Sequence, residues 1–375
     1  MKHGRRRPLT RDQIETTGAF IAAQQERDGS LPWCRGGKMD PWDHVQAAMG
    51  LALTGQMERA EAAFRYLAAT QERDGAWAAW RQGGRITDAT HETNHAAYLA
   101  TGLWYLHCAR PSVDFLAEMW PTLERAIEFV IGLQREDGVV YWATKGGEPW
   151  REPLLTGSSS THGSLVCAIR IAEALGRDRP VWRRARERLA AVIRGGRVPF
   201  RETALEDQNG RYSMDWYYPV LGGALRGALG RLRLLDAAMA EAYLEEGVGC
   251  RCVADQPWYT TAETCELVLA LDACGLSSRA AQVFSWMHPL RTEEGGYWTG
   301  VTHPERILYP EGEQTAWTAA TVLMAADALV GESPTAGFFR DLAGDDLEES
   351  GAARRATGTA GEVAPPAREA GRSRP

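Results

Sequence analysis

The stretch TQERDGAWAAW at residues 70–80 decides the fold, because the same phrase recurs along the chain. It reads QQERDGSLPW at 24–33 and LQREDGVVYW at 133–142, and RTEEGGYWTG at 291–300 is a weaker fourth copy. Each copy ends a helical stretch, turns at a glycine and reaches an aromatic residue. Glycine after a helix can adopt a positive φ. The phrase therefore predicts a repeated unit of helix, tight turn and loop.

A polar cluster and a helix rich in Ala, Gly and Leu follow in each unit. Charged, amphipathic helices such as 57–71 and 181–193 lie between these apolar ones. The starts are mostly roughly fifty residues apart, which suits two helices of about a dozen residues plus loops. The six apolar helices are expected at 40–53, 91–104, 158–171, 213–229, 259–271 and 311–325.

Six hairpins of one apolar and one amphipathic helix predict an all-α (α/α)6 toroid over residues 10–340, in which the apolar helices form an inner ring buried on every side. No strand-rich block is expected. Residues 1–9 are expected to be a flexible basic start, and the polar, Pro/Gly-rich residues 341–375 a disordered tail. Small residues let the inner helices approach closely, namely Ala47, Ala48, Gly50, Ala96, Ala97, Gly222, Gly223, Ala319 and Ala320.

The composition limits the kinds of partner that we expect for this protein. The net charge of -7 argues against nucleic acid or an anionic membrane. Apolar runs such as 318–330 are too short to span a bilayer, and no apolar segment of a signal peptide follows the basic start. We expect a cytoplasmic protein with reduced thiols. A homodimer is compatible with the sequence. No metal or cofactor is expected, because Cys250 and Cys252 lack a second pair at zinc-ligand spacing.

The polar helix starts point to a shared site. One such start is explained by capping alone, since Asp40 is a good N-cap, Pro41 suits the first helical position and Asp43 suits the first turn. If all six inner helices run the same way, however, their starts converge on one mouth. Acids and imidazoles gathered there indicate binding or catalysis. The expected contacts with substrate come from Trp42, His44, His91, Glu92, Asn94, His95, His162, Asp215, Trp216, Tyr217, Tyr259, Glu313 and Trp317.

Three acids are the strongest catalytic candidates. Asp43 lies in the first helical turn, where it can face the mouth, whereas Asp40 serves equally well as a cap. Glu263 is not needed as a cap if Thr260 or Thr261 does that work. A structural reading stands beside each histidine, because a lone histidine is more often a hydrogen-bonded wall residue.

The Q-x-x-x-G-x-W phrase at Gln71, Gly75 and Trp77 resembles the repeat of squalene and oxidosqualene cyclases and the toroid of protein prenyltransferase β-subunits. An enzyme acting on an isoprenoid is therefore one alternative. The chain has no Asp-x-Asp-Asp motif and no matching Asp, Cys, His zinc set, although Cys265 lies near Glu263. The mouth is also too polar to protect a carbocation.

Glycoside cleavage suits the residues better, because it needs an acid, a second carboxylate and aromatic faces for the sugar rings. The aromatic residues Trp42, Trp216, Tyr217, Trp258, Tyr259 and Trp317 supply such faces. A polysaccharide lyase or sugar epimerase on the same ring, with His or Tyr as base, and a ring that only binds carbohydrate or lipid are further alternatives.

The DPWDH start at 40–44, THETNH at 90–95 and WYTTAETCE at 258–266 resemble the actinobacterial hydrolases of methylmannose polysaccharide. The resemblance implies endo-cleavage of α-(1→4)-linked mannan or its 3-O-methylated form, with Asp40, Asp43 and Glu263 as the catalytic set. Our hypothesis makes Glu263 the general acid and Asp43 the base, assisted by Asp40, with the roles exchangeable. Opposite places on a ring favour the wider carboxyl separation of an inverting enzyme, roughly 6.5–9.5 Å, over the 5–5.5 Å of a retaining one.

Overall fold

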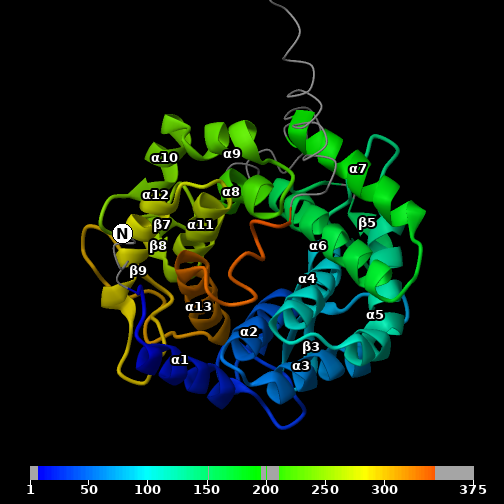
Figure 1. Ribbon diagram of the computed structural model, residues 1–375, viewed down its shortest axis with the longest axis horizontal. Coiled ribbons are helices and arrows are strands. Elements are labelled where there is room, and N and C mark those ends of the chain that lie inside the picture. Colours follow the sequence, from blue (N-terminus) through cyan, green and yellow to red (C-terminus); the bar gives the residue numbers. More distant parts are fainter. Residues whose placement is uncertain (1–6, 151, 196–199, 201–210, 343–375) are drawn as a thin grey trace, which may run out of the picture. The chain divides into compact units, whose positions relative to one another are not determined.

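The computed structural model describes residues 7–150, 152–195, 200 and 211–342. The chain divides into Met1–Ala343 and Gly344–Pro375, and the description concerns the first of these units. Helices dominate it and lie in an inner and an outer ring (Figure 1). The inner helices are α2 (Pro41–Leu53), α4 (Thr93–Ala109), α6 (Leu155–Ala174), α8 (Met214–Leu221), α11 (Thr261–Ala273) and α13 (Ala316–Val330).

The inner ring is closed. Each inner helix packs against the next one along the chain, and α13 returns to pack against α2. Small residues permit this packing as expected, since a Cβ added to Gly50 of α2 would lie 2.6 Å from the Cβ of Ala320 in α13. The outer ring consists of α1 (Arg11–Gln24), α3 (Met57–Thr70), α5 (Val113–Gly132), α7 (Pro180–Gly195), α9 (Gly227–Leu234), α10 (Ala237–Tyr243) and α12 (Ser277–Ser285), followed by the short 3-10 helix η2 (His288–Leu290).

The repeated phrase forms a hydrogen-bonded turn that joins neighbouring outer helices. The Gln71 side-chain amide donates to the carbonyl oxygen of Gly75 in its own turn (2.8 Å) and to that of Thr122 in α5 (2.9 Å). Gln25 and Gln134 make the same pair of bonds, to their own turns and to α3 and α7 respectively. Each turn therefore fixes the position of the next outer helix.

Glycine is required in these turns for two reasons. Gly75 has a φ of +97°, and a Cβ there would collide with the carbonyl oxygen of Arg125 in α5. Gly29 (+94°) and Gly138 (+98°) lie against α3 and α7 in the same way. A side chain would thus meet both an unfavourable backbone conformation and the backbone of the next helix.

The fourth copy closes the outer ring. Gly295 has a φ of +90°, and a Cβ there would lie 2.6 Å from the carbonyl oxygen of Thr16 in α1. The Arg291 guanidinium also donates to the Thr16 hydroxyl (3.1 Å). This copy has no glutamine, but the Thr292 amide donates to the Gly296 carbonyl (2.9 Å), as the equivalent amides do in the other turns.

The expectation of an all-α chain is confirmed only in part, because two antiparallel sheets lie in the loops between helices. One has the order β1 (Lys38–Met39), β2 (Ala78–Gln82), β3 (Arg85–Glu92), β4 (Ala143–Lys145) and β5 (Glu148–Trp150). The other has the order β6 (Leu244–Glu245), β7 (Gly249–Arg251), β8 (Trp258–Thr260) and β9 (Gly300–Thr302). Most of these strands are only two or three residues long, too short for a period-2 pattern to be recognised. Strands β3 and β8 lead directly into α4 and α11.

The ends of the packed region differ from the expected boundaries. Residues 7–9 are not a flexible start, since Leu9 is buried and the Arg7 guanidinium pairs with Glu332 (2.6 Å). Leu342 is also buried, so the packed region extends past residue 340. Residues 1–6 and 343–375, on which the other parts of these two predictions fall, lie outside the described residues.

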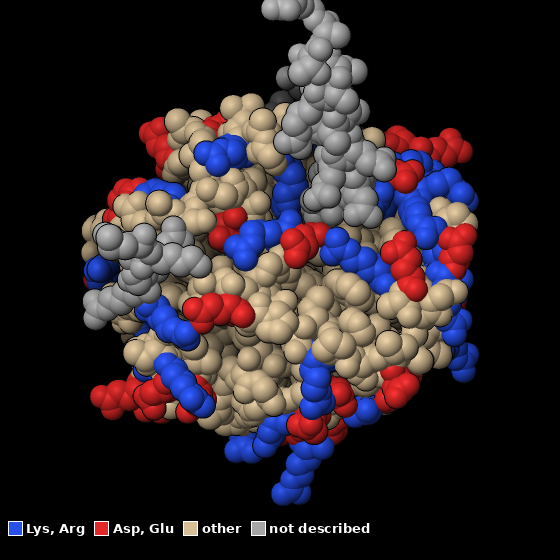
Figure 2. Space-filling model, viewed as in Figure 1, with Lys and Arg blue, Asp and Glu red and all other residues tan. Residues whose placement is uncertain are grey.

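Two further properties bear on the expected class of protein. Among the described helices, none has the length and apolar character needed to cross a membrane. All seven cysteines are free thiols, and Cys167, Cys250, Cys265 and Cys274 are buried. On the face seen in Figure 2, uncharged residues occupy much of the centre, and most charged residues lie toward the rim.

The glycine requirement can be tested with Gly75→Ala against Gly84→Ala. Gly84 also has a positive φ (+75°), but nothing lies within 4 Å of an added Cβ. We expect the control to lower the free energy of unfolding by roughly 1–2 kcal/mol through backbone strain alone. Gly75→Ala should lose roughly 1–3 kcal/mol more, because the α5 backbone must move. Urea unfolding measures both, and equal losses would show that the contact with α5 does not matter.

Candidate active site

The inner helices begin on the same side of the ring, as the repeat predicts. The Asp215 carboxylate at the start of α8 accepts hydrogen bonds from the backbone amide (3.0 Å) and the hydroxyl (2.6 Å) of Thr156 at the start of α6. The Ala316 amide at the start of α13 donates to the carbonyl of Trp33, which precedes α2 (2.8 Å). The prediction that Asp215 contacts substrate is therefore replaced by a structural role, because its carboxylate caps the neighbouring helix α6.

Asp40 is the N-cap of α2. Its Oδ1 accepts from the Asp43 backbone amide (2.9 Å), and its Oδ2 accepts from the Trp33 indole N–H (2.9 Å). The residue is 3% exposed. With a donor at each oxygen, the Asp40 carboxylate is held in one orientation beside the side chain of Asp43.

Asp43 lies in the first turn of α2, among three other acids. Burial raises the pKa of the Asp43 carboxyl well above its usual range. The negative charge of Asp40 and a hydrogen bond to its carboxylate raise this pKa further, as do the charges of Glu266 and Glu263. A carboxyl group that keeps its proton at an unusually high pH can act as a general acid.

Glu263 lies in the first turn of α11 and is 8% exposed. Its effect on the pKa of Asp43 places it in the same site as the α2 acids. The expectation that Thr260 or Thr261 caps α11 is wrong: Thr260 makes no side-chain cap bond, and the Thr261 hydroxyl donates to the carbonyl of Trp298 (2.7 Å). A threonine cap therefore does not free Glu263 from a structural role, and the catalytic role expected from the sequence stays a prediction.

Glu266 is a further acid that sequence reasoning missed. It lies one helical turn after Glu263 and is 2% exposed. Its Oε1 accepts from the Gln46 amide (2.9 Å) and the Tyr218 hydroxyl (2.7 Å), and its Oε2 accepts from the Tyr217 hydroxyl (2.8 Å). Burial raises the pKa of Glu266 to about 7. The i, i+3 spacing of the two glutamates in WYTTAETCE was the available signal, since such residues share a helix face.

Aromatic rings surround the acids. Trp42, beside Asp43 in the sequence, stacks on Tyr98 of α4 with ring centroids 4.8 Å apart. It also meets Tyr218 edge-on (5.5 Å) and lies 6.3 Å from the ring of His95. These rings link the first turns of α2 and α4 with α8.

A second aromatic group lies next to Asp40. Trp33, which donates to Asp40, is 5.5 Å from Trp80 of β2 and 6.1 Å from Trp317 of α13, measured between ring centroids. The Lys38 ammonium lies 3.7 Å from the centroid of Trp33. All three tryptophans are only partly buried, but the same ammonium lies 4.3 Å from the centroid of Trp80, so it covers one face of both Trp33 and Trp80.

Several buried polar atoms near the helix starts have no hydrogen-bond partner among the described residues. They are Asn94 Oδ1 and His95 Nδ1 of α4, Ser158 Oγ of α6 and Trp317 Nε1 of α13. Buried polar groups are normally paired, so such a set indicates a polar ligand. Glu92 lies at the same end, where its carboxylate accepts from the Trp142 indole N–H (3.1 Å). The sequence indicated Asn94, His95 and Trp317 but not Ser158.

The predictions that His44 and His162 contact substrate are wrong. His44 is 1% exposed; its Nδ1 accepts from the Leu31 amide (3.0 Å) and its Nε2 bonds to the carbonyl of Ala63 in α3 (2.9 Å). Neighbouring residues project about 100° apart on an α-helix, so His44 faces the outer ring when Asp43 faces the site. His162, also 1% exposed, bonds through Nδ1 to the Gly222 carbonyl (2.8 Å).

Trp216 and Tyr259 are also core residues, not substrate contacts. Trp216 is 1% exposed, lies parallel to Tyr243 and donates to the carbonyl of Arg233 (2.9 Å). Tyr259 is 2% exposed, and its hydroxyl accepts from the guanidinium of Arg251 (2.7 Å). Both are large aromatic residues that the sequence could not distinguish from surface platforms, because burial depends on the neighbouring strands and outer helices.

The last two candidates, His91 and Glu313, contact other residues than the central acids. His91 of β3 bonds to the carboxylates of Asp74 (2.6 Å) and Glu72 (3.3 Å), which belong to the second repeat turn. The Glu313 carbonyl accepts a hydrogen bond from the Thr299 amide (3.0 Å). Burial raises the pKa of the Cys34 thiol, and the negative charge of the Glu313 side chain raises it further. Neither residue contacts the Asp40, Asp43, Glu263 and Glu266 group through a described bond.

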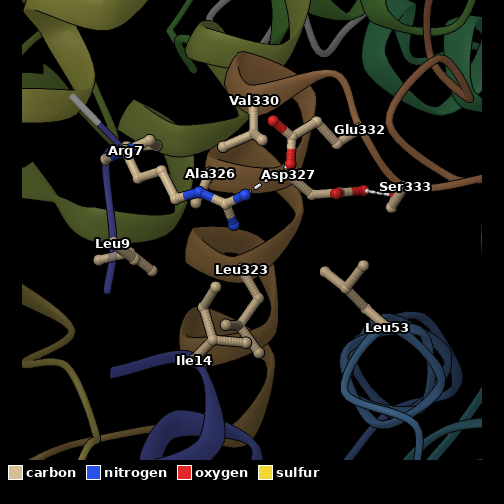
Figure 3. Close-up of a pocket in the computed structure, with 11 residues that line it drawn as sticks. Arg7, Leu9, Ile14, Leu53, Leu323, Ala326, Asp327, Val330, Glu332 and Ser333 are labelled. Carbon is tan, nitrogen blue, oxygen red and sulfur yellow. Dashed lines mark hydrogen bonds and ion pairs between the residues drawn. The ribbon is translucent and has the colours of Figure 1, made fainter. Parts of the chain in front are cut away.

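A separate pocket of about 310 Å³ lies at the opposite ends of the inner helices (Figure 3). Leu53 and Val330, the last residues of α2 and α13, are part of its lining. Asp327 is also there, and its carboxylate accepts from the hydroxyls of Ser333 (2.6 Å) and Thr335 (2.9 Å). Because the acids of the candidate site lie at the helix starts, this pocket is not part of it.

No family model matches the chain. The MMP endo-(1,4)-3-O-methyl-alpha-D-mannosidase of Mycolicibacterium hassiacum is 43% identical over 334 residues, which cover 89% of this chain and 90% of that protein. Among solved structures, a glycosidase variant in complex with glucose has a TM-score of 0.63 at 16% identity, covering 85% of this chain and 96% of that one. A D-mannose isomerase has a TM-score of 0.61 at 11% identity, covering 85% and 96%. Both structures are alike in fold alone.

The structural role of His162 predicts a pH-dependent contribution to stability. Burial lowers the pKa of His162 to about 4, so the unfolded chain binds more protons than the folded one between about pH 6.5 and 4. The contribution of the neutral ring is complete above this window and is lost as the pH falls through it. The unfolding free energies of wild type and His162→Asn should therefore differ by about 2 kcal/mol less at pH 5 than at pH 7.5. Urea unfolding at both pH values measures this, and a constant difference would contradict it.

Proposed function

This chain belongs to the family of the MMP endo-(1,4)-3-O-methyl-alpha-D-mannosidase, and we propose that it hydrolyses α-(1→4)-linked mannan chains internally, including the 3-O-methylated form. The observation that carries the proposal is the group of buried acids at the starts of α2 and α11, on a chain 43% identical to that mannosidase. We assign the double ring of helices to the (α/α)6 class, with the two sheets inserted between helices.

The environment of the acids supports Asp43 as the general acid, the exchanged form of the hypothesis drawn from the sequence. Burial and the charges around it favour the protonated Asp43 carboxyl. Asp40 accepts hydrogen bonds at both oxygens, so its carboxylate is held in a fixed orientation beside Asp43. Asp43 donates its proton to the glycosidic oxygen as the bond from that oxygen to C1 breaks.

Glu263 then acts as the general base. It removes a proton from the water whose oxygen forms the new bond to C1. The reaction leaves Asp43 ionised and Glu263 protonated, and exchange with solvent restores both groups. Because α13 lies between α2 and α11 in the inner ring, Asp43 and Glu263 come from helices that are not neighbours. This arrangement favours room for a water molecule and hence inversion at C1.

The substrate contacts follow from the unpaired groups. The partly buried ring of Trp317, and the faces of Trp33 and Trp80 that Lys38 does not cover, are suited to stack on sugar rings, and their apolar surface tolerates an O-methyl group. The unpaired atoms of Asn94 and Ser158 are suited to bind sugar hydroxyls. Aromatic and polar contacts around the acids are what an enzyme that holds several sugar units requires.

Product analysis is the direct test. Purified protein should convert α-(1→4)-mannooligosaccharides, plain or 3-O-methylated, into shorter oligomers, detected by chromatography and mass spectrometry. Asp43→Asn and Glu263→Gln should each lower the rate by roughly 10²–10⁴-fold, because each removes a proton-transfer group. Asp327→Asn, which changes a carboxyl group in the separate pocket of Figure 3, is the matched control and should cleave at nearly the wild-type rate. No cleavage of either substrate by the wild type would exclude the proposed activity. In the same time course, ¹H NMR should show the β-anomer of the new reducing end first.

Substrates with a fluoride leaving group separate the two roles. An α-mannooligosyl fluoride loses fluoride with much less need for an acid, whereas attack by water still needs a base. Asp43→Asn should therefore recover most of its lost rate on the fluoride, and Glu263→Gln should not. Recovery by Glu263→Gln alone would restore the opposite assignment, with Glu263 as the acid.

A further inference from the structure

Glu266 joins three inner helices at one carboxylate. It belongs to α11, and it accepts hydrogen bonds from Gln46 of α2 and from Tyr217 and Tyr218 of α8. Both oxygens are occupied, and the side chain is almost completely shielded from solvent, at 2% exposure. Three donors converging on one carboxylate are suited to an anion, because an ionised carboxylate only accepts hydrogen bonds.

The titratable groups around Glu266 are acids, thiols and phenols. Its nearest charged neighbour on α11 is Glu263, and its charge acts on Asp43 across the ring. The remaining titratable groups on which it acts are Tyr98 of α4, Tyr217 and Tyr218 of α8, Cys250 of β7 and Cys265 of α11. None of these groups is a cation. Among the described residues no ion pair neutralises Glu266, so hydrogen-bond dipoles stabilise its negative charge, which acts on Asp43.

A structural role alone does not explain this arrangement. A glutamine, or an apolar side chain of the same size, could fill the space without the cost of burying an ionised group. The carboxylate also lies against the wall of the site, because Tyr218, which it binds, contacts the edge of Trp42 (5.5 Å). The charge of Glu266 therefore acts on Asp43 in the first turn of α2, and its hydrogen bonds connect it to the residues around that turn.

We propose that Glu266 is a positioning residue of the active site, whose negative charge keeps the proton on Asp43 until that proton passes to the leaving group. The inference deepens the proposed function and rests on it. Glu266 itself touches no reacting atom. It acts through Asp43, and its bonds to Gln46 and the two tyrosines hold its charge at a constant place relative to that acid.

Two substitutions separate charge from shape. Glu266→Gln keeps the size of the side chain but removes the charge, whereas Glu266→Asp keeps the charge but shortens the side chain. Without the charge, Asp43 should lose its proton at lower pH. The alkaline limb of the pH profile of kcat/KM should therefore move down by roughly one pH unit in Glu266→Gln, about a tenfold loss of activity on that limb. In Glu266→Asp, the alkaline limb of the pH profile should keep its wild-type position, even if the rate and the stability of the variant fall.

An unmoved limb in Glu266→Gln, or equal shifts in both variants, would overturn the proposal and leave Glu266 a structural residue. If Glu266→Gln does not fold, Glu266→Asp still decides, because a downward shift with the charge retained contradicts the proposal. A substrate-free measurement distinguishes this failure from failure of the proposed function. In protein labelled with ¹³C at aspartate carboxyls, the Asp43 signal, assigned with Asp43→Asn, should titrate at lower pH in Glu266→Gln than in wild type. This result is expected whether or not mannan is cleaved.

Discussion

The outer ring depends on a glutamine side-chain amide that donates two hydrogen bonds. One goes to a carbonyl oxygen in its own turn, and the other goes to a carbonyl oxygen in the next outer helix. Gln25, Gln71 and Gln134 each make this pair of bonds. A side-chain amide that satisfies two backbone carbonyls fixes both the turn and the separation of consecutive outer helices. Helices α2, α4 and α6 each follow one of these glutamine turns, and α13 follows the fourth copy of the phrase, which lacks the glutamine. The turns therefore help to give these four inner helices the same direction.

The site keeps several acids close together at some expense of stability. Asp40, Glu263 and Glu266 are all nearly buried, and Asp43 lies among them. The fold tolerates this because donors surround the anions: the Trp33 indole and the Asp43 amide at Asp40, and three side chains at Glu266. Repulsion that remains favours a proton on Asp43. The same crowding that opposes folding therefore suits Asp43 to the proposed role of general acid.

The sequence predicted the parts of this architecture that follow from repetition. The recurring turn indicated the ring, and the family resemblance is confirmed by the relative that is 43% identical. Predictions for single residues failed where direction mattered: His44 lies one residue from Asp43 yet faces the outer ring, toward Ala63. The spacing of Glu266 from Glu263 was visible in the sequence, but its donors on α2 and α8 were not. The sheets were missed because most of their strands are shorter than one recognisable period.

The closure between Gly295 and Thr16 has a consequence for synthesis of the chain. These residues are separated by almost the whole ring in sequence, yet the outer ring closes only when the fourth turn packs on α1. Earlier turns use partners that emerge from the ribosome soon after them, so the first hairpins can assemble in order. Helix α1 must wait, with one side uncovered, until nearly three hundred residues have been made. Helix α1 thus stays open to chaperones and proteases during translation for longer than the hairpins that follow it.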